Sequence, residues 1–370
     1  MKTLGILGGG QLGRLLAGAA KDLGWRTAAL DPVPDAPALQ VVDEPVVGAV
    51  DDPEAAKRLA RVSDVVTLEW ELIPAPVLEE VARLRPLYPK PSVLETIQDR
   101  LTQKRFLEAA GFPQAAFAEV SAPGGVTSYP AIVKRRRHGY DGKGQARLSG
   151  PEDARAAAAL FAAPCVREEV VAFDKEVSVI LTRARDGRTA VFPVAENVHR
   201  GGILHATRAP ADVPAPVAAA AVELALKAAR ALDMVGTMTV EMFLLPGGRL
   251  LVNEIAPRVH NSGHYTLEAC ATSQFEQHVR AVCGLPLGPV DPKGPAVMVN
   301  LMGELWEKGE PDWSALEGVT GLTLHLYGKS AAHAGRKMGH YTVVGPEAAD
   351  EWLRADERLA ALRRGSRAAS

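Results

Sequence analysis

The sequence predicts a protein of mixed α/β and α+β class that begins with a doubly wound parallel sheet. Short apolar strands alternate with helical segments over residues 1–92, which is typical of parallel sheets covered by helices. Beyond them, β-branched and apolar runs separated by glycine turns predict further strands. The chain has 370 residues, of which 47% are hydrophobic. This length allows two or three domains with buried cores.

Composition excludes several classes of partner. The 42 Lys and Arg residues are balanced by 44 Asp and Glu residues, whereas proteins that coat nucleic acid carry a basic excess. No apolar run reaches the ~20 residues of a membrane span, and glycines interrupt the apolar N-terminal segment. Cys165, Cys270 and Cys283 have neither metal-ligand nor disulfide spacing. We therefore expect a cytoplasmic protein whose ligands are small molecules, with no nucleic-acid or membrane partner.

The first strand leads into a glycine motif. Strands are expected at residues 2–7, 27–30 and 64–68, with a helix over 15–23. GGGQLG (8–13) fits the G-x-G-x-x-G loop of dinucleotide-binding folds, and Asp31 ends the next strand near the position of their ribose-binding acid. The loop indicates a phosphate site at a helix N terminus, for NAD(P) or for another phosphorylated ligand.

The remaining chain is expected to contain helices and strands that end in a small β-rich domain. Helices are expected over residues 93–110, 151–162, 216–232, 273–283 and 346–364, and strands at 131–134, 165–171 and 176–181. We expect domains at residues 1–92, 93–290 and 291–370.

A hairpin carries the candidate metal site. Residues 237–245 and 249–256 are apolar strands joined by Pro-Gly-Gly, and Gly-Gly is a favoured two-residue loop. That loop places Glu241 opposite Glu254 on one face, with Cβ atoms ~5 Å apart. The repulsion requires a shared proton, a nearby arginine or a bridging cation, and Mg²⁺ prefers such hard oxygen ligands. A register slip that turns one glutamate to solvent is the alternative, and a three-residue turn would undo the pairing.

A glycine-rich loop follows the strand AIVK (131–134). GYDGKGQ (139–145) supplies N–H groups that can surround phosphate oxygens, and Lys134 supplies a charge at the end of the strand. The Walker A pattern is absent. A solvated basic turn is the alternative, although such a turn does not require Tyr140 and Asp141.

A polar cluster follows the second hairpin strand. EIAPRVHNSGH (254–264) places Arg258, His260 and Asn261 directly after the candidate metal site. A helix-capping segment with incidental polar residues is the alternative. His199, taken alone, is typical of a surface histidine.

Together these motifs resemble those of ATP-grasp enzymes, most closely the 5-(carboxyamino)imidazole ribonucleotide synthase family of purine biosynthesis. The resemblance covers nearly the whole chain. It rests on GGGQLGR (8–14), DRLTQK (99–104), IVK to GYDGKGQ (132–145), NVHRGGIL (197–204), NEIAPRVHNSGHYT (253–266) and GRKMGH (335–340). It implies an ATP-grasp architecture with an N-terminal pre-grasp domain and a small C-terminal domain, in a homodimer that uses ATP and magnesium.

The resemblance also implies residue roles for the nucleotide. Lys134 would contact the ATP phosphates, Glu176 the ribose hydroxyls, and Glu241 with Glu254 would ligate magnesium. The full ATP-binding set would be Arg100, Lys134, Gly139, Tyr140, Asp141, Gly142, Lys143, Gly144, Gln145, Glu168, Glu169, Val170, Val171, Glu176, His199, Asn253 and Glu254.

A second set of residues would serve 5-aminoimidazole ribonucleotide. The resemblance assigns its binding to Gln11, Leu12, Glu69, Glu71, Lys329, Arg336 and Lys337, and catalysis to Tyr140, Asp141, Lys143, Arg258, His260 and Asn261. Arg336 and Lys337 would hold its phosphate. The segment TLEWELIP (67–74) departs from the usual family pattern at Leu72, and Gly9 stands where the family often has asparagine.

The implied reaction is the ATP- and bicarbonate-dependent carboxylation of 5-aminoimidazole ribonucleotide through carboxyphosphate, which yields ADP and phosphate. The nearest alternative is another ATP-grasp ligase, such as formate-dependent glycinamide ribonucleotide transformylase. An alternative of another class is an NAD(P)-dependent oxidoreductase that uses the glycine loop. A non-catalytic nucleotide sensor would bind the nucleotide without turnover.

Overall fold

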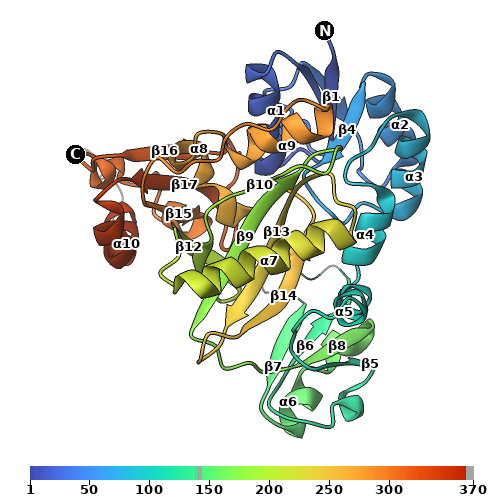
Figure 1. Ribbon diagram of the computed structural model, residues 1–370, viewed down its shortest axis with the longest axis vertical. Helices are drawn as coiled ribbons and strands as arrows, with labels where there is room; N and C mark the ends of the chain where they lie inside the picture. The colour runs from blue at the N-terminus through green and yellow to red at the C-terminus, as the bar shows by residue number, and fades with distance from the viewer. Residues whose placement is uncertain (138, 140–143, 364–370) are drawn as a thin grey trace.

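The computed structural model describes residues 1–137, 139 and 144–363, and its described part contains three sheets (Figure 1). The first is the N-terminal parallel sheet, with strand order β3-β2-β1-β4. Its strands are β1 (Thr3–Leu7), β2 (Arg26–Asp31), β3 (Glu44–Val47) and β4 (Val65–Leu68), and its helices are α1 (Gln11–Asp22), α2 (Pro53–Arg61) and α3 (Ala75–Leu84). Every residue of β1 is buried, as expected for a parallel strand covered on both faces. The predicted doubly wound domain is confirmed.

Two helices follow where the sequence predicted one. The expected helix over 93–110 is instead α4 (Pro91–Ile97) and α5 (Arg100–Ala109). The side chain of Asp99 accepts hydrogen bonds from the amides of Leu101 and Thr102 at 3.0 and 3.2 Å, and so caps α5. The cap starts a new helix at the position where the candidate ligand Arg100 stands.

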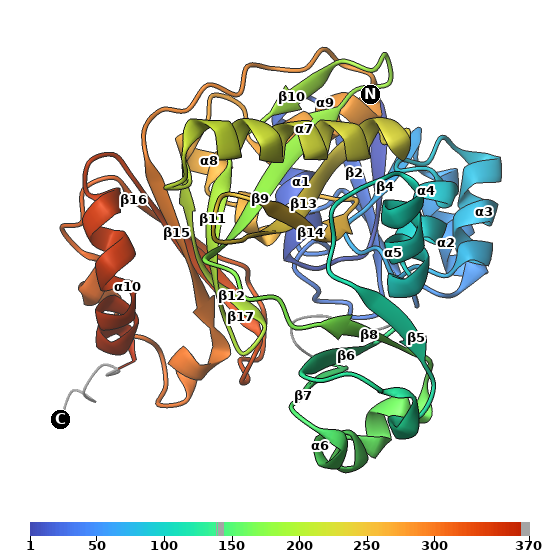
Figure 2. The ribbon, with the colours of Figure 1, turned by 60° about the horizontal axis from the view of Figure 1, so that its bottom comes forward.

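A small antiparallel sheet forms a separate layer, visible below the rest of the molecule in Figure 2. Its strand order is β5-β8-β6-β7, with β5 (Phe117–Val120), β6 (Ala131–Arg135), β7 (Gln145–Leu148) and β8 (Cys165–Glu169). Helix α6 (Pro151–Ala156) and a 3-10 turn at Ala158–Ala162 replace the expected helix over 151–162. Strand β6 carries Lys134 at its end, as predicted.

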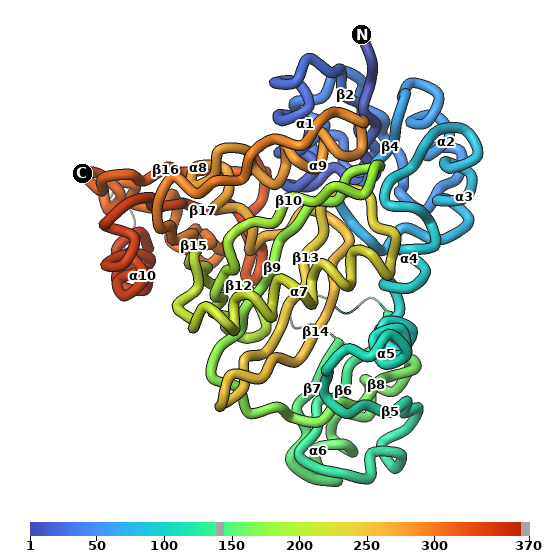
Figure 3. The backbone as a smooth tube through the Cα atoms, in the orientation of Figure 1, coloured from blue at the N-terminus to red at the C-terminus, as the bar shows by residue number. Residues whose placement is uncertain are grey.

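The third sheet has nine strands in the order β14-β13-β9-β11-β12-β15-β17-β16, with β10 paired to β9. The strands are β9 (Lys175–Arg183), β10 (Thr189–Val191), β11 (Ala195–Arg200), β12 (Ile203–Ala209), β13 (Gly236–Leu244), β14 (Leu250–Ala256), β15 (Ala296–Met302), β16 (Leu322–Leu326) and β17 (Lys337–Val344). The C-terminal strands continue this sheet, since β15 pairs with β12, and α10 (Ala348–Leu362) packs beside them (Figure 3). The domain boundaries at 92 and 290 stay a prediction.

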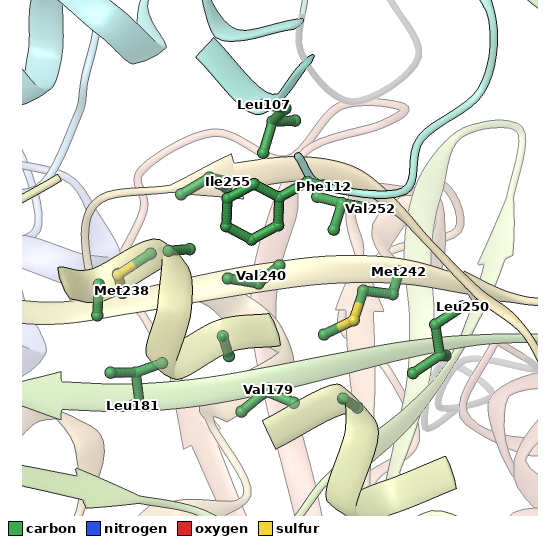
Figure 4. Packing of buried hydrophobic residues seen from close by; sticks show 14 of the residues in the cluster. Leu107, Phe112, Val179, Leu181, Met238, Val240, Met242, Leu250, Val252 and Ile255 are labelled. Atoms are coloured by element: carbon green, nitrogen blue, oxygen red, sulfur yellow. The ribbon is translucent and has the colours of Figure 1, made fainter. Parts of the chain in front are cut away.

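The two faces of the central sheet have different roles. Val179, Val240 and Met242 join a buried cluster with Ala221 and Ala225 of α7 (Ala215–Ala231). Figure 4 labels the three strand residues within this cluster. Because side chains alternate along a strand, their neighbours turn to the opposite face. That face holds the polar side chains described below. No described helix has both the length and the apolar character that a membrane crossing needs.

Helix α9 (Gln274–Cys283) connects the central sheet to the N-terminal domain, with the short helix α8 (Thr266–Ala269) before it. The ring of His278, on α9, lies between β13 of the central sheet and β4 of the N-terminal sheet. Its Nδ1 accepts from the amide of Thr237 at 3.0 Å, and its Nε2 lies 2.7 Å from Thr67 Oγ1. Because Nδ1 accepts, Nε2 carries the hydrogen and donates to Thr67. One fully buried imidazole thus joins β13 to β4.

Candidate active site

A cleft of about 630 Å³ receives side chains from the large sheet and the small antiparallel sheet, and from α1 and the segment after β4 in the N-terminal domain. It brings together most of the residues that the sequence singled out. These are Gln11, Leu12, Glu69, Glu71, Arg100, Lys134, Gly139, Gln145, Glu176, His199, Glu241, Asn253, Glu254, Arg258, His260, Asn261 and Lys337.

Glu241 and Glu254 lie opposite each other, as predicted, but the loop differs from the prediction. The amide of Leu245 donates to Arg249 O, so the turn has three residues and not the expected two. From Met242 to Leu244 the register is accordingly shifted by one residue. A bulge then restores the predicted register: Met242 pairs with Val252 and Glu241 with Glu254, which leaves Asn253 as the extra residue.

The two carboxylates have opposite pKa shifts. Burial and the nearby charge of Glu254 raise the pKa of Glu241 to about 7. Burial alone would raise the pKa of Glu254 too, but Arg100 and Lys134 lower it to about 2. The Arg100 Nη1 donates to Glu254 Oε2 at 2.8 Å. The charge of Glu254 is therefore offset by Arg100. The raised pKa of Glu241 favours binding of a proton or a cation at that carboxylate.

Two lysines share one buried carboxylate at the end of β6. Lys134 Nζ lies 3.1 Å and Lys104 Nζ 3.3 Å from the same oxygen of Glu168. Burial would raise the pKa of Glu168, yet the two lysines hold it below its usual range. Burial lowers the pKa of Lys104. Since two cations face one anion, the group carries a surplus positive charge that suits a phosphate ligand.

His199 stands on β11 beside Glu176 of β9. Its Nδ1 lies 2.8 Å from Glu176 Oε2. Burial would lower the pKa of this imidazole, but Glu176 and Glu241 raise it instead. The sequence taken alone favoured a surface histidine, whereas the structure gives this side chain a place in the cleft.

The glycine loop before α1 already has anionic partners within the chain. Asp31 Oδ2 accepts from the amide of Gly9 at 2.9 Å. Glu69 accepts from the amides of Gly10 and Gly13 at 2.8 and 2.9 Å. A dinucleotide phosphate would need these same donors, so the arrangement counts against NAD(P) at this turn.

The amides of Gln11 and Leu12 differ from those of the glycines. Neither donates a hydrogen bond within residues 1–137, 139 and 144–363. Both residues line the cleft. These first helical amides are therefore the donors that the loop can offer to a ligand.

Beside the loop, Arg258 and Glu71 form a two-bond ion pair. Arg258 Nη2 donates to Glu71 Oε1 at 2.9 Å and Nε donates to the other oxygen. Burial would lower the pKa of Arg258, but Glu71 raises it. The departure at Leu72 leaves this segment in the cleft, which Leu72 itself lines.

His260 and Asn261 follow β14 at a 3-10 turn (Asn261–Gly263). The His260 Nε2 lies 3.6 Å from Glu241 Oε1. The amide groups of Asn261 and Asn300 donate to each other at 2.7 and 3.0 Å, so β15 fixes the orientation of Asn261. A cap is present in this segment, but the capping side chain is that of His260, which accepts from the amide of Ser262 at the 3-10 turn. The expected cap of the following helix by Asn261 or Ser262 is wrong, since α8 has no side-chain cap and Ser273 caps α9.

Other expected residues do not line the cleft. Among them are Gly144, Glu168, Glu169, Val170, Val171, Lys329 and Arg336. Glu168 nevertheless contacts Lys134, and Lys329 donates to the carbonyl of Lys337 at 2.6 Å. Tyr140, Asp141, Gly142 and Lys143 lie outside the described residues.

Sequence reasoning missed several lining residues. Phe243 and Phe173 stack with ring centroids 4.7 Å apart and form an aromatic wall beside Glu176. Strand alternation gave a signal for Phe243, which stands two residues from Glu241 and on its face. Trp70 and Gln103 also line the cleft, and Gln103 Oε1 accepts from the amide of Ile255.

Three family models match consecutive parts of the chain. They describe a ribonucleotide synthetase preATP-grasp domain at residues 1–98, an ATP-grasp domain at 104–275, and a phosphoribosylaminoimidazole carboxylase C-terminal domain at 296–351. A curated N5-carboxyaminoimidazole ribonucleotide synthase from Brucella melitensis is 46% identical over 353 residues, which cover 93% of this chain and 96% of the relative.

Solved structures agree with these matches. The ADP complex of an N5-carboxyaminoimidazole ribonucleotide synthetase has a TM-score of 0.93 and 42% identity, and covers 98% of both chains. The Aspergillus clavatus N5-carboxyaminoimidazole synthase was solved with ADP and 5-aminoimidazole ribonucleotide. It has a TM-score of 0.88 and 34% identity, and covers 98% of this chain and 99% of its own.

Proposed function

Since the chain belongs to the N5-carboxyaminoimidazole ribonucleotide synthase family, it is an ATP-dependent ligase that carboxylates 5-aminoimidazole ribonucleotide, and we propose that the cleft performs this reaction. The observation that carries the proposal is the pair Glu241 and Glu254, which face each other beside Arg100 and Lys134. Carboxylates and cations in this order suit a metal-bound triphosphate.

The nucleotide binds at the end formed by β6, β9 and β13. Lys134 and Arg100 contact the phosphates, and the resemblance assigns the loop 139–145 to the same phosphates. Glu176 receives the ribose hydroxyls beside the aromatic wall, near His199. The segment Glu168–Val171 forms the adenine hinge, an assignment supported by the resemblance and by the contact of Glu168 with Lys134.

The residues present fit magnesium. Glu241 and Glu254 offer hard oxygen ligands, and the raised pKa of Glu241 reflects burial and a repulsion that a cation would relieve. Asn253 Oδ1, beside them, is buried and has no hydrogen-bond partner within the described part of the chain. Magnesium, when bound, offsets the charge of the phosphoryl group under transfer.

The acceptor substrate binds at the end formed by the N-terminal loops and β17. The amides of Gln11 and Leu12 face it, beside Glu69, which holds the glycine loop, and Glu71, which pairs with Arg258. The resemblance gives its phosphate to Arg336 and Lys337; of these Lys337 lines the cleft, and Lys329 donates to the carbonyl of Lys337. Catalytic contacts come from Arg258, His260 and Asn261 in the cleft, and the resemblance adds Tyr140, Asp141 and Lys143.

The reaction proceeds in three steps. A bicarbonate oxygen attacks the γ-phosphorus of ATP, the bond to the β–γ bridging oxygen breaks, and carboxyphosphate and ADP form. Carboxyphosphate then divides into carbon dioxide and phosphate. The exocyclic amine of 5-aminoimidazole ribonucleotide forms a bond to the carbon and loses one proton. Lys134 and Arg100 stabilise the charge that develops on the phosphoryl oxygens.

The decisive experiment measures phosphate release from ATP and bicarbonate. We expect release that requires 5-aminoimidazole ribonucleotide and not glycinamide ribonucleotide, which distinguishes this ligase from the transformylase. Release with glycinamide ribonucleotide and formate would overturn the assignment. Binding without any turnover would instead indicate a nucleotide sensor.

The assembly follows from the same resemblance, and the location from the cysteine usage and the lack of an apolar span in the sequence. We infer a cytoplasmic homodimer with domains at residues 1–92, 93–290 and 291–370. Analytical ultracentrifugation tests the dimer, because a monomer of 39.2 kDa would contradict it.

A further inference from the structure

We propose that His260 serves as a neutral hydrogen-bond donor, held in that state by a directed chain of buried side chains behind its ring. The inference rests on the proposed function, because it concerns the carboxylation end of the same cleft. The resemblance placed His260 among the catalytic residues without fixing its role. The hydrogen bonds around the ring decide between a donor and a base.

Two donors converge on the Nδ1 atom of His260. The backbone amide of Ser262 reaches it at 3.3 Å and the Ser262 hydroxyl at 2.9 Å. A backbone N–H can only donate, so Nδ1 must accept. A neutral imidazole that accepts at Nδ1 carries its hydrogen on Nε2.

The direction of the chain behind Ser262 supports the same tautomer. Thr207 Oγ1 donates to Asn197 Oδ1 at 2.9 Å, and Asn197 Nδ2 donates to Ser178 Oγ at 2.9 Å. Because the amide nitrogen can only donate, the Ser178 hydroxyl is an acceptor there and uses its own hydrogen for Ser262 Oγ at 3.0 Å. The hydrogen of Ser262 is then left for Nδ1 of His260.

The chain crosses neighbouring strands of the central sheet and is closed to solvent. Thr207, Asn197 and Ser178 stand on β12, β11 and β9, with relative exposures of 0%, 5% and 0%, and Ser262 is also at 0%. Reversing one hydroxyl would leave a buried polar atom without its partner. The sheet therefore fixes the donor and acceptor roles before any ligand arrives.

The opposite side of the ring faces the cleft. His260 Nε2 lies 3.6 Å from Glu241 Oε1, and Ser178 is the cross-strand partner of Glu241. An N–H at this place can donate to an anionic carboxylate or phosphate oxygen of the reacting species. It offers no lone pair to the amine, so the amine proton must leave to another group. Ser262, Ser178, Asn197 and Thr207 act as positioning residues.

The tautomer can be measured directly on the full-length protein. We would record long-range ¹H–¹⁵N correlations with ¹⁵N-labelled histidine, and assign His260 by the signals lost in His260→Gln. We expect an unprotonated nitrogen shift at Nδ1 and a protonated one at Nε2. A hydrogen on Nδ1, in the neutral or the cationic ring, would overturn the inference.

Substitutions at the ring test the donor role. The amide nitrogen of a glutamine reaches about as far as Nε2, whereas that of an asparagine reaches only as far as Nδ1. We expect His260→Gln to keep kcat within about tenfold of wild type and His260→Asn to lose about a hundredfold or more, as for loss of a transition-state donor. Equal losses in both variants would contradict a donor at Nε2.

A matched pair of variants tests the chain. Ser178→Ala removes a hydroxyl of the chain, and we expect kcat to fall about tenfold, with an unchanged KM for ATP and a shifted Nδ1 signal. Thr182→Val removes a buried hydroxyl of the same strand that contacts Thr237 at 2.7 Å, and we expect wild-type kcat. Equal losses would show that the chain is only structural. Absent turnover in wild type would refute the proposed function, while the tautomer measurement would still decide this inference.

Discussion

The buried imidazole of His278 predicts a specific pH dependence of stability. Burial lowers its pKa from the ordinary 6.5 to about 3. Protonation would also place a hydrogen on Nδ1, against the amide of Thr237 that donates to it. Below pH 6.5 His278 therefore binds a proton in the unfolded chain but not in the folded protein. Its contribution to the free energy of unfolding is complete above pH 6.5 and is lost progressively as the pH falls towards 3.

The magnitude follows from the two pKa values. Their separation corresponds to about 5 kcal/mol in full, of which about 2 kcal/mol is lost between pH 8 and pH 5. A variant without an ionisable group at this position does not lose this part of the unfolding free energy between about pH 8 and pH 5. We therefore expect His278→Gln to lose about 2 kcal/mol less unfolding free energy than wild type over this interval.

Urea unfolding, followed by tryptophan fluorescence and circular dichroism at both pH values, measures this difference. The matched control is His333→Gln, which removes an exposed histidine far in sequence from α9. We expect the control to follow wild type. Equal losses of stability in wild type and His278→Gln would refute the reasoning.

Three further predictions concern the cleft. Glu254→Gln should lower substrate-dependent phosphate release by about a hundredfold or more with an unchanged circular dichroism spectrum, because a ligand of the transferring phosphate's cation is lost. Retained activity would contradict the metal assignment. Phe243→Ala should raise the KM for ATP several-fold with little change in kcat, since Phe173 loses its stacking partner, and steady-state kinetics will detect it. Lys104→Met should weaken ADP binding about tenfold in calorimetry, because Glu168 then keeps its remaining lysine from the phosphates; unchanged affinity would exclude this sharing.

Sequence reasoning predicted the N-terminal sheet because its strands are buried on both faces and carry a continuous apolar signal. It merged α4 and α5, because residues 93–110 stay helical in composition and only the capping role of Asp99 divides them. It gave no strand to residues 195–200 and 203–209, although β11 and β12 lie at the centre of the large sheet. Polar residues such as Asn197 break the apolar alternation there, and they do so because they serve the buried chain behind His260.

The pairing of Glu241 with Glu254 was predicted correctly only because two unforeseen features of the hairpin cancel each other. The hairpin turn is one residue longer than expected, and the bulge at Asn253 compensates for it. Rules for strand pairing count residues between strands, and they do not predict where a bulge such as the one at Asn253 inserts an extra residue. Residues such as Asn300 and Lys104 were missed because their partners, Asn261 and Glu168, are distant in the sequence.

The carboxylates that occupy the glycine loop also bear on how such loops diverge. Asp31 and Glu69 belong to the chain itself and accept the hydrogen bonds that a phosphate group would accept, so the turn keeps its shape without any cofactor. A glycine-rich turn that matches a cofactor fingerprint can thus be held in shape by carboxylates of the chain itself. Evolution of a new specificity at this turn would then require removal of a residue rather than addition of one.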